Sequence, residues 1–341
     1  MPNYRSSLSC RDRLQRRAMM YSQIREFFAR HDVLEVETPV FSQAGNTDPA
    51  ISSVVADFSS EPVAQSSVNL SDNSAENLFN QSINKSDKRY AHSSPEFAMK
   101  RLLANGSGAI YQICKVFRKE ECGRLHNPEF SMLEWYRPGL TYHQLMDEIA
   151  ELLISLGLTA AVERISYAEL FQLHLKLDVL NASVNDLKAC AIENGLEVIG
   201  FDDDYDAWTS MLLANLIEPK LGADNPVFVF DYPVSQAALA SVREIDNVAE
   251  RFELYINGIE VANGYQELTD ANAYRERFEQ DNKKRILSGL PEINMDNRLL
   301  NDLSSGLPDS SGVALGLDRL LMILSGEKNI KEVMSFDFQN I

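Results

Sequence analysis

Residues Val116–Pro138, with the sequence VFRKEECGRLHNPEFSMLEWYRP, constrain the fold of this 341-residue chain more than any other stretch. Two apolar runs flank a segment rich in turn-forming residues, including Gly123 and Pro128, and this order is typical of a β-hairpin. We expect the first strand of the hairpin to continue through Glu120. Because side chains two residues apart lie on the same face of a strand, Arg118 and Glu120 could then contact one ligand together.

The loop of this hairpin carries Arg124, His126 and Asn127, whose hydrogen-bond donors suit a phosphate group. Phe130 follows the loop directly and could stack on a base. Together with the Arg-x-Glu pair, these side chains are suited to binding a nucleotide. An ordinary hairpin with a surface ion pair would carry the same Arg-x-Glu pattern, so the function class depends on the other parts of the chain.

Charge and composition limit the partners of the protein. Hydrophobic residues make up 45% of the chain and charged residues 24%, as in an ordinary soluble globular protein of one or two domains. The formal net charge is −18, which disfavours the wrapping of a long polyanion, because nucleic-acid binding depends on Lys and Arg. This charge suits a basic partner or a cationic substrate, or it serves solubility alone.

The cysteine spacing and the lack of long apolar runs indicate the cellular location of the protein and the redox state of its thiols. The four cysteines, Cys10, Cys114, Cys122 and Cys190, show neither CxxC nor CxxH spacing, so we predict neither a zinc site nor a disulfide scaffold. No signal peptide is evident, and no apolar run approaches the roughly 18 residues of a membrane span. The sequence therefore predicts a cytoplasmic protein with reduced thiols and no membrane partner.

The N-terminal region combines a helix and a strand. Apolar residues at helical spacing predict an amphipathic helix over Arg11–Arg30, and alternation predicts a strand over Val33–Val40 that meets Pro39 near its end. A long helix that runs into such a strand is a common dimer element, but a pair that is simply part of the core would have the same pattern.

Between residues 59 and 94 the composition changes, and about half of the residues are Ser, Asn or Gln. We predict a flexible surface insertion over about 59–92, in which Val68–Leu70 and Leu78–Ile83 could add edge strand. Order returns where Ser94, Pro95 and Glu96 open a helix over Phe97–Ala104. Glu96 either begins this helix and nothing more, or faces the same pocket as the hairpin.

Further scaffold elements are expected, without chemistry of their own. They are helices over Thr141–Leu156, Tyr167–Leu177, Asp202–Leu216 and Tyr274–Gly289, and a buried strand over Pro226–Pro233.

The second informative stretch is Ala249–Asp270. An Asn-Gly pair at Asn257 and Gly258 predicts a hairpin with strands Phe252–Ile256 and Ile259–Ala262. The stretch also carries several carboxylates, namely Glu250, Glu253, Glu260, Glu267 and Asp270. Carboxylates among apolar strands are costly unless they meet a cation, so they suit Mg²⁺ on a nucleotide or an amine substrate, or else lie on solvated faces.

A strand flanked by Gly312 and Gly316, followed by an apolar helix that Asp318 and Arg319 open, ends the informative part of the chain. Glycine lets backbone approach a ligand closely, and an arginine at the start of a helix can reach a phosphate and lie flat on a base.

Taken in order, three stretches resemble the three motifs of class II aminoacyl-tRNA synthetases: Arg11–Pro39, Phe117–Tyr136 and Gly312–Ile323. The segments SPEFAMKRL, HNPEF, MLEWY and VANGYQEL are similar to those of the lysyl branch. The resemblance implies an α+β fold, the class II catalytic core, with a mainly antiparallel six-stranded sheet flanked by helices. It also implies a homodimer.

Two features depart from the lysyl-tRNA synthetases. The chain begins directly with the first motif, without the roughly 100 residues that an anticodon-binding domain needs, and Ala314 stands where those synthetases have glycine. In both respects the chain is similar to the truncated lysyl paralogues that attach (R)-β-lysine to a lysine of elongation factor P. This resemblance implies a single catalytic domain over residues 1–341 that uses ATP, Mg²⁺ and (R)-β-lysine. Elongation factor P would be its acceptor, and tRNA would not be a partner.

The resemblance also implies roles for individual residues. Arg118 and Arg319 would be catalytic, stabilising charge on the phosphates and contacting ATP. The other ATP-binding residues would be Lys119, Glu120, His126, Asn127, Phe130, Glu260, Val261 and Gly316. Glu253 and Glu260 would hold Mg²⁺. The amino-acid substrate would be bound by Ser94, Pro95, Glu96, Tyr136, Asn263, Glu267 and Ala314.

Two other functions fit the same residues. An enzyme that forms lysyl adenylate could pass the amino acid to a different amine, and the adenylation chemistry would be identical. A non-catalytic regulatory paralogue could bind ATP or a partner without turnover. Activity in ATP–pyrophosphate exchange separates the second alternative from an enzyme.

Overall fold

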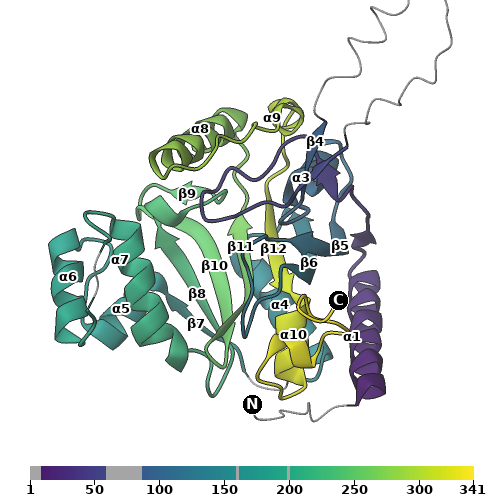
Figure 1. Ribbon diagram of the computed structural model, residues 1–341, viewed down its shortest axis with the longest axis horizontal. Coiled ribbons are helices and arrows are strands. Elements are labelled where there is room, and N and C mark those ends of the chain that lie inside the picture. Colours follow the sequence, from purple (N-terminus) through teal and green to yellow (C-terminus); the bar gives the residue numbers. More distant parts are fainter. Residues whose placement is uncertain (1–8, 59–86, 159–160, 198–199) are drawn as a thin grey trace, which may run out of the picture.

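The computed structural model describes residues 9–58, 87–158, 161–197 and 200–341. A large mixed sheet runs through the centre of the molecule, with α1 along one side and the group of α5, α6 and α7 on the other (Figure 1). Within the described residues the sheet has nine strands, and eight of them form one continuous order. That order is β1 (Leu34–Glu35), β5 (Ile110–Phe117), β6 (Glu129–Pro138), β12 (Ser310–Gly316), β11 (Ile259–Gln266), β10 (Val248–Ile256), β8 (Val227–Pro233) and β7 (Glu163–Ser166).

The expectation of a six-stranded sheet needs correction. The six central strands, β5, β6, β12, β11, β10 and β8, pair antiparallel with their neighbours. At the two edges, β1 and β7 add parallel pairs. The ninth strand, β9 (Val242–Arg243), pairs with β10. Three short strands, β2 (Phe41–Ser42), β4 (Lys88–Ala91) and β3 (Val55–Asp57), form a separate small sheet.

The described helices are α1 (Cys10–Arg30), α3 (Glu96–Ala104), α4 (Tyr142–Ser155), α5 (Tyr167–Leu175), α6 (Val184–Glu193), α7 (Tyr205–Leu212), α8 (Ala271–Leu287), α9 (Asn297–Ser304) and α10 (Leu317–Leu324). Four of them, α1, α4, α5 and α6, begin with a capping box, in which a Ser or Thr and an acidic or amide side chain three residues later bond each other's backbone N–H. None of the helices in the described ranges is both long and apolar enough to cross a membrane.

One face of the sheet is the hydrophobic core. Leu133 and Trp135 of β6 are fully buried there against α1, α4 and α10. Helix α1 contributes an apolar stripe at helical spacing, which consists of Met20, Ile24, Phe27 and Phe28. With one face covered in this way, the alternate side chains of the same strands point to the opposite face, where they line a large cavity.

Most sequence-predicted elements are present. The N-terminal helix, the helix after Glu96 and both hairpins form as expected. In the β10–β11 hairpin, Asn257 and Gly258 have φ angles of +53° and +71°, the left-handed conformation that this two-residue turn requires.

Several boundaries differ from the predictions. The first hairpin strand ends at Phe117, and Lys119 and Glu120 lie in a turn, so the argument that Arg118 and Glu120 share one strand face was wrong. Only Leu34–Glu35 of the expected strand Val33–Val40 is extended in the sheet.

Two more predictions need comment. The expected helix Asp202–Leu216 starts at Tyr205 and continues beyond Leu212 as a π-helix, η1 (Leu213–Ile217). Residues 88–91 of the predicted flexible insertion form β4, while 59–86, including Val68–Leu70 and Leu78–Ile83, lie outside the described residues.

Candidate active site

The candidate site is a cavity of about 1100 Å³ on the open face of the sheet. Strand register places one residue from each of four neighbouring strands in a row across its floor: Glu134, Ala314, Asn263 and Glu253. A second row, two residues along each strand, consists of Tyr136, Gly312, Tyr265 and Arg251. Because side chains alternate between the two faces of a sheet, both rows face the cavity. Seven of the eight residues line it with their side chains, and Gly312 lines it with its backbone.

One end of the cavity is acidic. The carboxylate of Glu134 is 2% exposed and accepts hydrogen bonds from Ser94 Oγ at 2.6 Å and from Tyr136 OH at 2.8 Å. Glu96, at the start of α3, and Glu267, which follows β11, line the same end. Three carboxylates therefore converge where the residues predicted to bind the amino acid were expected.

A buried lysine lies behind two of these carboxylates. Lys100 Nζ is 2.6 Å from Glu96 Oε1 and 2.6 Å from Glu267 Oε2, and it donates to Tyr274 OH at 2.8 Å. Its side chain is 0% exposed. Burial acts to lower the pKa of Lys100, but the charges of Glu267 and Glu96 outweigh this effect and raise the pKa well above its ordinary value.

The pKa values of the acidic end are shifted toward neutrality. Burial, together with the charge of Glu96, raises the pKa of Glu134 to about 8. Burial raises the pKa of Glu267 to about 7, although the Lys100 ammonium opposes this shift. A cationic group that enters the cavity would relieve the cost of ionising both carboxyls.

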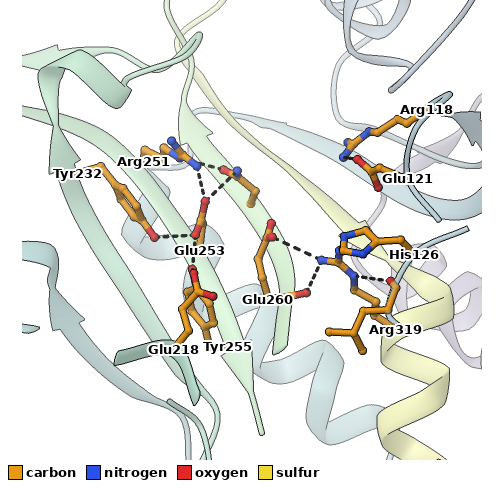
Figure 2. A network of polar contacts seen from close by, with 12 residues as sticks. Arg118, Glu121, His126, Glu218, Tyr232, Arg251, Glu253, Tyr255, Glu260 and Arg319 are labelled. Carbon is orange, nitrogen blue, oxygen red and sulfur yellow. Dashed lines mark hydrogen bonds and ion pairs between the residues drawn. The ribbon is translucent and has the colours of Figure 1, made fainter. Parts of the chain in front are cut away.

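The opposite end of the cavity carries arginines (Figure 2). Arg319, in the first turn of α10, donates to the carbonyl oxygen of Glu260 at 2.8 Å and lies 3.4 Å from Glu260 Oε2. Its Nη2 is 2.7 Å from His126 Nε2. Burial and the charge of Arg319 lower the pKa of His126, so its Nε2 can accept this hydrogen bond as a neutral imidazole.

Arg118 is the second arginine at this end. Its Nη1 is 3.0 Å from Glu121 Oε1, and its guanidinium lies 5.2 Å from the centre of the Phe130 ring. Its side chain is 27% exposed. Both arginines therefore reach the cavity with their guanidinium groups only partly engaged, and a flat aromatic surface lies beside one of them.

Glu253 and Glu260 were predicted to hold Mg²⁺, but their carboxylates differ in how far other side chains already occupy them. Both oxygens of Glu253 are occupied: Oε1 by Arg251 and Asn263, and Oε2 by Tyr232 at 2.7 Å and Tyr255 at 2.6 Å (Figure 2).

Glu260 has a 40% exposed side chain, and within the described part of the chain Arg319, at 3.4 Å, is the one partner of its carboxylate. Within the described ranges no three His, Cys, Asp or Glu side chains gather to form a metal site. The residues thus fit a Mg²⁺ ion that is carried by phosphates and contacts one carboxylate, Glu260.

Two glycines of β12 have different surroundings. A Cβ added to Gly312 would lie 2.3 Å from Glu267 Oε1 and 2.4 Å from Tyr136 Cε1, so only glycine lets those two side chains close over the strand. A Cβ at Gly316 would meet its nearest neighbours at 3.8 Å, an ordinary contact. Gly312 is therefore required by the acidic end, whereas the fold does not require Gly316.

The cavity brings most of the sequence-predicted residues together. Its lining includes fifteen of them: Ser94, Glu96, Arg118, His126, Asn127, Phe130, Tyr136, Glu253, Glu260, Val261, Asn263, Glu267, Ala314, Gly316 and Arg319. Three lie outside the lining, namely Lys119 and Glu120 in the turn after β5 and Pro95, which lines a second, smaller cavity. Glu121, one residue beyond Glu120, reaches the cavity and meets Arg118.

Sequence reasoning missed Glu134 and Lys100. Both carried a usable signal: Glu134 stands two residues before Tyr136 on the same strand face, and Lys100 stands four residues after Glu96 on the same helix face. Arg251 was also missed, although it carried the same signal, because it stands two residues before Glu253 on β10 and contacts that carboxylate.

The fold and this site define a class of protein. A family model described as tRNA synthetases class II (D, K and N) matches residues 4–340. The chain therefore belongs to this family, as the three motifs indicated.

Curated relatives narrow the similarity further. A protein of Enterobacter sp. (strain 638) named elongation factor P–(R)-β-lysine ligase is 45% identical over 325 residues, which cover 95% of this chain and 94% of the relative. Proteins with the same name from Erwinia tasmaniensis and Histophilus somni (strain 2336) are each 44% identical, over 95% and 94% of this chain and 94% and 93% of their own lengths.

Proposed function

We propose that this protein is a ligase that activates (R)-β-lysine with ATP and transfers it to a lysine side chain of elongation factor P. The observation that carries the proposal is a single cavity with two partly free arginines at one end and three carboxylates, two of them buried, at the other. One end suits a polyphosphate and the other a diamine. The names of relatives that match along nearly the whole chain support the particular substrates.

In the first step, a carboxylate oxygen of β-lysine attacks the α-phosphorus of ATP, and the bond from this phosphorus to the pyrophosphate oxygen breaks. Arg118 would neutralise charge that develops on the α-phosphate, and Arg319 would contact the terminal phosphate. Phe130 and the guanidinium of Arg319 would lie on either side of adenine. Such catalysis consists of positioning and charge stabilisation and needs no covalent protein nucleophile.

A Mg²⁺ ion bound to the phosphates would supply further charge neutralisation. Glu260 is the carboxylate suited to hold it, because its side chain is half exposed to the cavity and only loosely paired. Glu253 instead holds Arg251 and Asn263 in place.

In the second step, the neutral amine of the acceptor lysine attacks the carbonyl carbon of the adenylate. The bond to AMP breaks, the new amide loses one proton, and AMP leaves. The cavity has to remain open to a protein side chain for this step. Because adenylation is the same for any acceptor, a different amine acceptor remains the alternative that the site itself fits equally well.

The acidic end would bind the two amines. Glu96 would take the amine near the reacting carboxylate, and Glu267 with Tyr136 would take the terminal ammonium, with Asn263 nearby. We add Glu134 to this set, because the partners of its buried carboxylate among the described residues, Ser94 and Tyr136, are both neutral donors. Ala314 lies between Glu134 and Asn263 in the strand register, where its methyl group could shape the pocket for the β-amine.

We further infer that residues 4–340 act as one catalytic domain and that two copies associate through α1. Two large apolar side chains of α1 support this inference, since Leu14 is 50% and Met19 63% exposed. Sedimentation equilibrium tests it, and a monomer at micromolar concentration would contradict it.

Two measurements test the proposed reaction. ATP–pyrophosphate exchange that depends on β-lysine is expected for the ligase and not for a non-catalytic paralogue. Intact-mass spectrometry of elongation factor P, after incubation with the protein, ATP and each lysine isomer in turn, should show the mass of one β-lysyl group. Exchange without any mass increase would favour a different amine acceptor, and a reaction without ATP is the control.

A further inference from the structure

Lys100 is a fully buried cation at the acidic end, and the proposed reaction does not use it directly. It lies on the second turn of α3, and it is absent from the cavity lining. Its Nζ contacts Glu96 and Glu267 at 2.6 Å each. These two carboxylates come from elements far apart in the sequence, the helix α3 and the segment after β11.

Several titratable groups surround Lys100. They are Glu96 on α3, Glu134 and Tyr136 on β6, Tyr265 on β11, Glu267 after β11, and Tyr274 on α8. In this set three carboxyl groups face one ammonium. Without that ammonium, the buried Glu267 would lie beside the charge of Glu96 and would lose the interaction that lowers its pKa, so it would keep its proton to a higher pH.

Building on the proposed function, we propose that Lys100 is a positioning residue that holds Glu96 and Glu267 in place and favours the charged form of Glu267 before the substrate arrives. A protonated carboxyl would have to lose its proton before it could pair with an ammonium group. With Lys100 in place, both carboxyl groups already have the direction that the two amines of the substrate require, and the ammonium makes Glu267 easier to ionise. Lys100 thus couples the two amine subsites through a single buried atom.

The decisive variant is Lys100→Met, which keeps most of the length of the side chain and removes its charge. We expect kcat/KM for β-lysine in pyrophosphate exchange to fall, with the loss in the KM for β-lysine and little change in the KM for ATP. The loss should depend on pH, because the freed carboxyl must now be deprotonated. If the acidic limb moves up by one pH unit from the pKa of about 7 of Glu267, the loss should be about sixfold larger at pH 6.5 than at pH 8.5.

Tyr274→Phe is the matched control. It removes the 2.8 Å hydrogen bond from Lys100 to Tyr274 OH but keeps the charge, so it should keep the pH profile of the unmodified protein. An unchanged profile in Lys100→Met, or an equal shift in both variants, would overturn the inference. The absence of exchange in the unmodified protein would instead contradict the proposed function, so the two failures are distinguishable.

The single variant removes the cation between Glu96 and the buried Glu267 and could fail to fold, which circular dichroism would reveal. The double variant Lys100→Met, Glu267→Gln then replaces it, because it removes both members of one ion pair. We expect a raised KM for β-lysine at every pH without the shifted acidic limb. An unchanged KM in the double variant would show that this pair does not serve amine binding and would overturn the proposal.

Discussion

Ser94 Oγ donates a 2.6 Å hydrogen bond to Glu134 Oε2, and this contact joins the residues before α3 to the centre of β6. The other oxygen of Glu134 accepts from Tyr136 at 2.8 Å. Both donors are neutral, so within the described part of the chain this buried carboxylate has hydrogen bonds but no ion pair. A substrate ammonium group would supply the ion-pair partner that the Glu134 carboxylate lacks.

Replacing Glu134 with Gln should therefore weaken amine binding. A hydrogen bond to a charged group contributes about 1.5–3 kcal/mol, so we expect the KM for β-lysine to rise by about 10- to 100-fold, while the KM for ATP changes little. Steady-state pyrophosphate exchange measures both. Glu129→Gln is the control. Glu129 lies on the same strand, but its side chain is half exposed and forms a long, 3.5 Å ion pair with Lys115, so this variant should leave both KM values unchanged. An equal effect of the two variants would contradict the role of Glu134.

The raised pKa of Glu134 also predicts how stability depends on pH. Burial and the charge of Glu96 raise this pKa from 4.5 to about 8 in the folded protein. The folded state therefore binds this proton more tightly than the unfolded state, and the resulting stabilisation is present below pH 4.5 and is lost as the pH rises through about 8. We expect the Tm of the substrate-free protein to fall between pH 6 and pH 9, and to fall less in Glu134→Gln. Parallel Tm curves for the two proteins would exclude this linkage.

Much of the fold could be predicted from the sequence because local signals coincide with it. The Asn-Gly turn at Asn257 and the apolar run of β6 each depend on nearby residues only. The edges of the sheet were less predictable. The parallel partners β1 and β7 gain their strand pairing from residues distant in the sequence, and short two- or four-residue strands leave almost no pattern.

The site, like the fold, was predictable only where local sequence determines it. Family motifs selected residues that line the cavity, but they could not show which side chains are already engaged. Glu253 has the charge of a metal ligand, yet Arg251 and two tyrosines occupy it. Glu120 was placed on a strand that ends three residues earlier, because an apolar run does not mark where hydrogen bonding stops.

The two glycines of β12 give a paired test of the acidic end. Gly312→Ala would press a methyl group against Glu267 and Tyr136, and overpacking of this kind costs about 1–3 kcal/mol. We expect a lower Tm and a raised KM for β-lysine. Gly316→Ala meets only ordinary contacts at 3.8 Å, so it should leave the Tm unchanged. Thermal unfolding of both variants checks the contrast, and a larger loss of stability in Gly316→Ala would refute the packing argument.

Substitutions at Glu253 and Glu260 should distinguish a structural carboxylate from a metal-binding one. Glu253→Gln removes the charge that faces the buried Arg251, so we expect the free energy of unfolding to fall by about 1–3 kcal/mol. Glu260→Gln alters a half-exposed carboxylate and should leave stability nearly unchanged. Instead it should raise the Mg²⁺ concentration needed for half-maximal pyrophosphate exchange. A higher Mg²⁺ requirement in Glu253→Gln than in Glu260→Gln would reverse the assignment made here.

Ala314 provides a test of substrate choice. In the strand register its Cβ lies between Glu134 on one side and Asn263 on the other, in the row that forms the cavity floor. In β-lysine the first amine is one methylene further from the carboxylate than in α-lysine, and a difference of one methylene is worth about 1–3 kcal/mol in selectivity. We therefore expect Ala314→Gly to shift the ratio of kcat/KM values toward α-lysine by about tenfold, as a change of preference and not as exclusion. Pyrophosphate exchange with each isomer measures this ratio, with Tm as the control for folding. An unchanged ratio would mean that the methyl group of Ala314 does not shape the end of the pocket at which the two isomers differ.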